Sequence, residues 1–275
     1  MARLGYLRYR QGRLDEAVAL FEQVLHVPIA QLGLGWLALD IGEAQSARDH
    51  AERYLRRVPR ENRTERVPGL ELITRANLVL SNMHDAQSAL SELVDIAHGI
   101  GTDPLLAIAS MTAGIAAAAE NDHDRARSLL EDAVDLFGRS GAPYEMGLAR
   151  IALAISLEAL GRIPVAEHEA QAAMATYKEL GAERQLARAE ALLQHLSRIS
   201  QAEPTQGKSS SRQSLSQRQR EVLGLIAQGL SDAEIADRLA LSQHTVHRHV
   251  GNILTKLGVR SRAAAIAYAA REKLL

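Results

Sequence analysis

The stretch between Ser242 and Lys256 combines side chains that can bind a polyanion and hydrogen-bond with bases. It carries three histidines, an arginine, an asparagine and two threonines, and it contains neither Asp nor Glu. An ordinary exposed helix interleaves charges of both signs. A surface without carboxylates instead suits contact with phosphates and with the acceptor-rich edges of bases in the major groove of DNA.

Helical periodicity divides this stretch into two faces. At about 100° per residue, one apolar stripe is formed by Val246, Val250, Ile253 and Leu257, and we expect it to face a core. The opposite side is polar or small and consists of His244, Arg248, Gly251 and Thr255, with His247 and Asn252 at its margins. The sequence therefore predicts a helix from Ser242 to Leu257 with one face free to bind.

Cap residues mark the neighbouring helices. Two serines are each followed three residues later by a residue that can complete a capping box, Ser216 by Gln219 and Ser231 by Glu234. The other signals are the stops at Gly229 and Gly258, the cap Ser242, and Ser261 before an alanine-rich helix that reaches Ala270. We therefore expect four short helices, with a very short turn between the second and the third.

These segments resemble the DNA-binding domain of LuxR-type regulators. The family pattern runs L-T/S-x-R-E-x-E-V-L, G-x-S-N-x-E-I-A, L-x-x-S-x-x-T-V-K-x-H-V and I-x-x-K-L-x-V-x-x-R. The chain reads LSQRQREVL from Leu215, GLSDAEIA, LALSQHTVHRHV and ILTKLGVRSR. Three positions depart from the pattern: Gln219 replaces Glu, Asp232 replaces Asn and His247 replaces the frequent Lys. The last departure concerns the preferred DNA sequence and not the fold.

The resemblance implies a four-helix helix-turn-helix domain over residues 215–275, whose third helix enters the major groove and whose last helix often pairs two copies. Base-reading positions carried over from the family and from the helical wheel are His244, His247, Arg248 and Gly251. Contacts with the DNA backbone are expected from Thr245, His249, Asn252, Thr255 and Lys256. The expected dimer face consists of Ala263, Ile266, Ala267 and Ala270.

Each assignment has a simpler alternative. Arg248 and Lys256 could be solvated charges, and the alanines of the last helix are first of all good helix formers. His244, His247 and His249 could be a metal cluster, but His249 lies on another side of the helix, so three ligands do not converge. We expect neither a metal nor a cofactor.

Composition indicates an all-α, two-part cytoplasmic protein. Of 275 residues, 47% are hydrophobic and only 3% aromatic, which favours helices packed through Ala, Leu, Ile and Val. There are no cysteines, no apolar region follows the N-terminal arginines, and no apolar run is long enough for a membrane span. From residue 210 onward ten Lys and Arg face five Asp and Glu, whereas the preceding part has a net charge of −6. The basic end is therefore the expected partner of DNA.

Residues 1–199 contain internal repeats. Ala86, Ala126 and Ala166 are 40 residues apart, as are Gly101, Gly141 and Gly181. Four phrases start with Gly12, Gly42, Asn121 and Gly161, and each has an alanine five residues later, which is typical of antiparallel helix pairs that cross closely. The pattern resembles tetratricopeptide repeats, as in MalT-type regulators, and predicts a helical solenoid. The alternative is the core of a simple helical bundle.

A solenoid would leave a concave wall for an effector or a protein partner. Polar residues that could line it, or could equally be solvated surface, are Arg75, Asn77, Glu145, Arg150 and Arg188. The first unit is short, so we expect that the chain begins inside a repeat. In MalT-like proteins a nucleotide-binding module would precede it, and the alternative is a naturally short protein. Residues 200–214 are rich in Ser and Gln and predict a flexible linker. Within it, AEPTQGKS matches a relaxed phosphate-loop pattern but lacks the preceding strand.

The leading hypothesis is a transcription regulator that binds double-stranded DNA as a homodimer and is controlled by its repeats. A sigma-factor-like protein shares two of the motifs, but HVGNILTKLGVRSR fits the LuxR pattern better. A repeat scaffold with a decayed DNA domain is a further alternative. An enzyme is not expected, because no Gly-rich loop in a strand context, metal triad or cysteine nucleophile is present.

Overall fold

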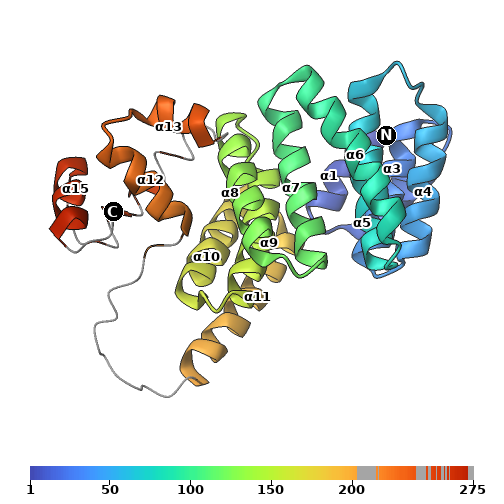
Figure 1. Ribbon diagram of the computed structural model, residues 1–275. Coiled ribbons are helices and arrows are strands. Elements are labelled where there is room, and N and C mark those ends of the chain that lie inside the picture. Colours follow the sequence, from blue (N-terminus) through green and yellow to red (C-terminus); the bar gives the residue numbers. More distant parts are fainter. Residues whose placement is uncertain are drawn as a thin grey trace. The chain divides into compact units, whose positions relative to one another are not determined.

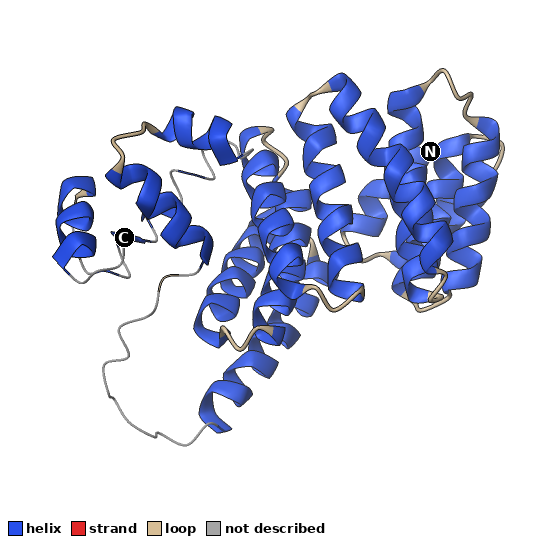
Figure 2. Cartoon of the chain, viewed as in Figure 1, coloured by secondary structure: helices blue, strands red, loops and turns tan. Residues whose placement is uncertain are grey.

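The computed structural model describes residues 1–202, 215, 217–239, 246, 249–251, 253–254, 257, 259 and 261–271. Within these residues every regular element is an α-helix, as Figure 2 shows, and this confirms the all-α prediction. The chain divides into two compact units, Met1–Ala202 and Glu203–Leu275. No helix in the described ranges is both long and apolar enough to cross a membrane.

The first unit consists of five helical hairpins and a final helix, which follow one another from blue to gold in Figure 1. Its helices are α1 (Ala2–Arg10), α2 (Leu14–Glu22), α3 (Pro28–Asp40), α4 (Ala44–Arg57), α5 (Arg63–Val79), α6 (Met83–Ile100), α7 (Asp103–Ala119), α8 (His123–Arg139), α9 (Pro143–Ala159), α10 (Ile163–Leu180) and α11 (Glu183–Ala202). Each helix packs against the next, and α1, α3, α5, α7 and α9 also contact one another in succession. This two-layer arrangement is that of a solenoid, as predicted.

A residue in the left-handed conformation closes every hairpin. These residues are Gly12, Gly42, Ser81, Asn121 and Gly161, with φ between 59° and 86°. Glycine adopts this conformation without a steric cost, and asparagine tolerates it. Four of the five turns coincide with the predicted starts of the repeat phrases. The turn at Ser81 was missed, because serine gives no signal for a left-handed backbone.

The alanine five residues after each turn lies at a helix crossing. Ala17, Ala47, Ala126 and Ala166 are fully buried, and Ala86 is 2% exposed. An alanine at such a position lets two helix backbones approach closely. These burials place the repeated alanines in the core of the repeat unit, as a close packing of the helices requires.

Helix α1 meets the far end of the unit. It contacts α11, and its Arg10 forms an ion pair with Glu145 of α9. Arg184 of α11 donates to the carbonyl oxygen of Asp40 at 3.0 Å, and the Tyr9 hydroxyl donates to the carboxylate of Asp40 at 2.7 Å. Burial raises the pKa of the Tyr9 phenol, as does the adjacent Asp40 carboxylate, so the hydroxyl remains a donor. The first and last helices of the solenoid are thereby joined.

The second unit contains α12 (Gln217–Ala227), α13 (Asp232–Leu239) and α15 (Arg262–Arg271). Its core is formed mainly by Val222, Leu223, Ile226, Ile235, Val246, Ile253 and Ala269. Gly229 has φ of 84° and ends α12, as predicted. Helix α11 continues to Ala202, so it extends three residues into the stretch assigned to a linker; residues 203–214 lie outside the described residues.

Candidate functional site

The apolar stripe of the predicted third helix is buried in the second unit. Val246, Val250 and Ile253 are helical and 0%, 8% and 1% exposed, and Leu257 packs against the same core. This burial confirms the phase of the helix that the sequence predicted. It also fixes which side of the helix faces away from the domain.

Two residues of the predicted DNA contacts fall within the described residues. Gly251 is helical and exposed, and among the described residues, apart from the backbone of its own helix and its chain neighbours, no atom lies within 4 Å of the position that a Cβ would take there. A nucleic-acid backbone or base could therefore approach this point of the helix closely. His249, by contrast, is 7% exposed, so only a small part of its ring could reach a phosphate.

The other predicted DNA contacts lie outside the described residues. For base reading these are His244, His247 and Arg248, and for the DNA backbone they are Thr245, Asn252, Thr255 and Lys256. Their roles stay predictions, as does the role of His249.

A capping box sets the start of α13. The Ser231 amide donates to Glu234 Oε2 at 2.7 Å, and the Glu234 amide donates to Ser231 Oγ at 3.3 Å. The hydrogen bond from the Ser231 backbone lowers the pKa of the Glu234 carboxyl, and the Ser231 hydroxyl adds to this shift. The box, predicted from sequence, is confirmed, and it positions the helix that precedes the candidate recognition helix.

Two arginines of the motif hold the helices of the domain together. Arg218 of α12 donates to the carbonyl oxygen of Leu239 at 2.8 Å, at the end of α13. Arg262 of α15 pairs with the Asp232 carboxylate and donates to the carbonyl oxygen of Leu230. Sequence reasoning missed these roles, although both arginines belong to the motif. The departure at Asp232 therefore supplies a charged partner for Arg262.

Helix α15 presents only part of the predicted dimer face. Ala265 and Ala269 are buried in the core, and Ile266 is partly buried against it. Ala267 is exposed, while the side chains of Ala263 and Ala270 lie outside the described residues. Ser261 caps the helix as predicted, since its Oγ accepts from the Ala264 amide at 3.1 Å. Pairing of two copies through this helix stays a prediction.

The polar residues predicted for the concave wall of the repeats divide into two groups. Arg75, Glu145 and Arg188 line a cavity of about 950 Å³ that is formed by the odd-numbered helices. Asn77 is 1% exposed, and Arg150 pairs with the buried carboxylate of Glu169, so these two belong to the packing of the helices.

The fold and the site define a two-part helical protein, with a repeat solenoid and a helix-turn-helix unit. Residues 213–269 match the family model described as bacterial regulatory proteins of the luxR family, and residues 2–27 match a tetratricopeptide repeat model. The C-terminal part is thus a LuxR-type domain and the N-terminal part a tetratricopeptide-like solenoid, as the sequence predicted.

Two further similarities each cover a part of this chain. The oxygen regulatory protein NreC of Staphylococcus aureus is 46% identical over 61 residues, which are 22% of this chain and 28% of NreC. The chain thus spans less than a third of the curated relatives that it matches. The solved structure of TTC0263, a thermophilic tetratricopeptide repeat protein from Thermus thermophilus, covers 69% of this chain and 96% of its own length. Its sequence identity is 23% and its TM-score 0.52, so this likeness concerns the fold alone.

Proposed function

We propose that this protein is a transcription regulator that inserts the helix from Ser242 to Leu257 into the major groove of promoter DNA. The observation that carries the proposal is the buried stripe Val246, Val250 and Ile253 within a domain 46% identical to that of NreC. Because this stripe faces the core, the acid-free side is the one that can approach a polyanion.

The repeats would control this activity by binding an effector or a protein partner. We propose that the regulator acts in the cytoplasm without catalysis and binds DNA as a homodimer through the last helix.

Ala267 is exposed on α15, so Ala267→Glu places a charge on the proposed pairing face without entering the core. Sedimentation of the protein on an operator duplex should show two copies for the parent and one for this variant. If two copies of the variant bind the duplex, this face is not the pairing surface.

The DNA site can be found by selecting bound duplexes from a random pool. The binding constant should fall as the salt concentration rises. A plot of its logarithm against the logarithm of the salt concentration should have a slope of about −0.9 for each phosphate contacted. A full chain that binds no duplex at low salt would refute the proposed function.

Base reading can then be separated from phosphate contact. On the selected site, Arg248→Ala should weaken the free energy of DNA binding by roughly 1–3 kcal/mol and relax the sequence preference at one base pair. Lys256→Ala should weaken binding to all duplexes alike. Arg220→Ala is a matched control, because Arg220 is an exposed arginine of α12 outside the proposed recognition helix. An equal loss on every sequence for Arg248→Ala would mean that Arg248 contacts phosphate only.

A further inference from the structure

The solenoid encloses a cavity with an apolar wall. Its volume is about 950 Å³, at the upper end of the range of small-molecule sites. The apolar part includes Trp36 and Leu39 of α3, Ile108 and Ile115 of α7, and Leu148 of α9, all of them partly exposed. These side chains come from separate repeats, so the wall exists only in the folded solenoid.

Charged groups of the same cavity are mostly paired with one another. Arg10 pairs with Glu145, Arg184 with Asp40 at 3.6 Å, and Arg75 with Glu71 at 2.7 Å. The Arg75 guanidinium also lies over the Trp36 ring, 5.2 Å from its centroid. Burial raises the pKa of the Glu71 carboxyl, and Arg75 opposes this shift. Three of the four cations in the wall thus already have carboxylate partners.

The fourth cation, Arg188 of α11, is exposed, and within the part of the chain that the structure describes it forms no ion pair. One turn before it, Gln185 lines the same cavity. Gln185 is 4% exposed, yet its Oε1 atom accepts no hydrogen bond from any described residue. A buried acceptor without a donor is costly, so an N–H or O–H group from a ligand would be stabilised there.

We propose that this cavity binds a small amphipathic acid, with its apolar body against Trp36 and Ile115, a donor group at Gln185 and a single carboxylate at Arg188. The proposal rests on the proposed function, since it supplies the chemical class of the effector. The net positive charge of the wall and its one unpaired cation favour an anion over a neutral or cationic molecule.

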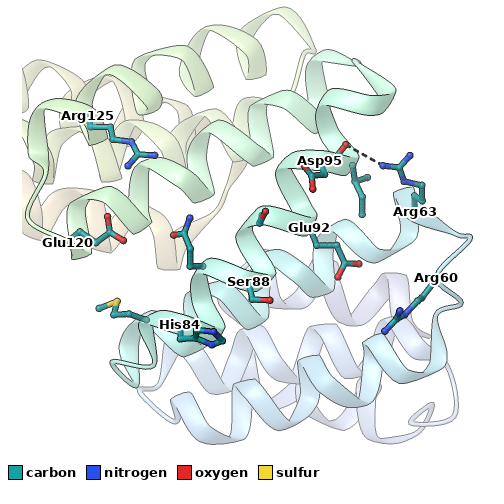
Figure 3. A pocket seen from close by; sticks show the side chains of 12 residues that line it. Arg60, Arg63, His84, Ser88, Glu92, Asp95, Glu120 and Arg125 are labelled. Atoms are coloured by element: carbon teal, nitrogen blue, oxygen red, sulfur yellow. Dashed lines mark hydrogen bonds between the residues drawn. The ribbon is translucent and has the colours of Figure 1, made fainter.

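A second hollow, on the outside of α6, fits such a ligand less well. It has a volume of about 1120 Å³ and is lined by polar side chains of both signs, as Figure 3 shows. Arg63 already donates to the carbonyl oxygen of Asp95 at 3.3 Å, and Glu92 already pairs with Arg66. This hollow offers no apolar wall comparable to that of the inner cavity.

The only tryptophan in the chain reports on the proposed site. Because Trp36 lines the cavity, a bound ligand should change its fluorescence. The probe is N-decanoylglycine, which has an apolar chain, an amide N–H and a carboxylate. Its analogue N-decanoylglycinamide carries an uncharged amide of similar size in place of the carboxylate, and dodecanoate lacks the amide N–H of the probe. Each is titrated into the full chain below its micellar concentration.

We expect saturable binding of N-decanoylglycine with one molecule per chain, at least tenfold tighter than N-decanoylglycinamide and tighter than dodecanoate. Arg188→Gln should abolish the preference for the acid over the amide. Arg198→Gln removes an exposed arginine from the same helix outside the cavity and should preserve the preference. Equal binding of acid and amide, equal behaviour of the two variants, or the absence of saturation would overturn the proposal. DNA binding by the same samples is measured in parallel. Samples that bind DNA but not the ligand refute only the proposed ligand site, whereas samples that bind no DNA refute the proposed function.

Discussion

Replacing Gly147 by alanine should destabilise the repeat solenoid, although alanine is the better helix former. A Cβ at Gly147 of α9 would lie 2.6 Å from Cζ of Tyr177, whereas carbon atoms pack at about 3.5–4.0 Å. The Tyr177 side chain is fully buried, its hydroxyl donates to the Tyr144 carbonyl oxygen, and its ring packs edge-on against that of Tyr144. The ring therefore has little room to move, and overpacking of this kind costs roughly 1–3 kcal/mol.

Gly138→Ala provides the matched control. Gly138 is an exposed residue of α8, and a Cβ there would meet only Met146 Sδ at 3.7 Å, an ordinary contact. Alanine is the better helix former at both positions, although the gain is smaller at Gly138 in the last turn of α8, so a lower stability of Gly147→Ala than of Gly138→Ala reports the overpacking. For a unit of this size, each kcal/mol of difference in unfolding free energy lowers the melting temperature by about 2–4 °C. We therefore expect Gly147→Ala to melt at a lower temperature than Gly138→Ala.

The assay is thermal unfolding followed by far-ultraviolet circular dichroism. Fluorescence of Trp36 identifies the transition of the repeats, because the chain has no other tryptophan. Equal stabilisation by the two alanines would refute the reasoning, since it would mean that Tyr177 adapts to the added methyl group without cost.

Three further predictions concern other contacts. Glu169→Ala should lower the free energy of unfolding by about 3–5 kcal/mol, because it leaves the Arg150 guanidinium without its buried partner. Urea unfolding measures this loss, and recovery of stability when Arg150→Met is added would support the cause. Ser231→Ala should cost about 1 kcal/mol and speed hydrogen exchange in α13. The Ser231 backbone hydrogen bond and, after it, the Ser231 hydroxyl lower the Glu234 pKa from 4.5, so the stability that this carboxylate contributes is present above pH 4.5 and is lost as pH falls through the lower folded value. Ser231→Ala removes only the hydroxyl, so a carboxyl titration by NMR should show a midpoint in this variant that is nearer 4.5 but still below it. Arg262→Ala should destabilise the C-terminal unit by about 1–3 kcal/mol, seen as a lower second melting transition, and unchanged melting would contradict its anchoring role.

Features with a local cause could be predicted from the sequence. The capping box at Ser231, the stop at Gly229 and the buried stripe with Val246 and Ile253 depend on residues within a few turns of one another. The fold of the repeats was predictable for the same reason, because each turn and its alanine recur at a fixed spacing.

Features that join distant segments could not be predicted. The ion pair between Arg10 and Glu145 joins residues 135 apart, and the bond from Arg184 to Asp40 spans 144. Sequence alone left Arg75, Glu145 and Arg188 as either wall or solvated surface, because the curvature of the solenoid decides between these alternatives. The anchoring role of Arg262 was missed since its partners precede it by about 30 residues.

The contact between α1 and α11 affects how the solenoid loses its structure. In an open array each repeat touches only its neighbours, so the terminal repeats fray first and unfolding spreads inward. Here the two ends hold each other, through Tyr9 and Arg184 on the shared Asp40. Neither end can unravel alone, so the array should gain cooperativity and behave more like a single globular domain than like a string of independent modules.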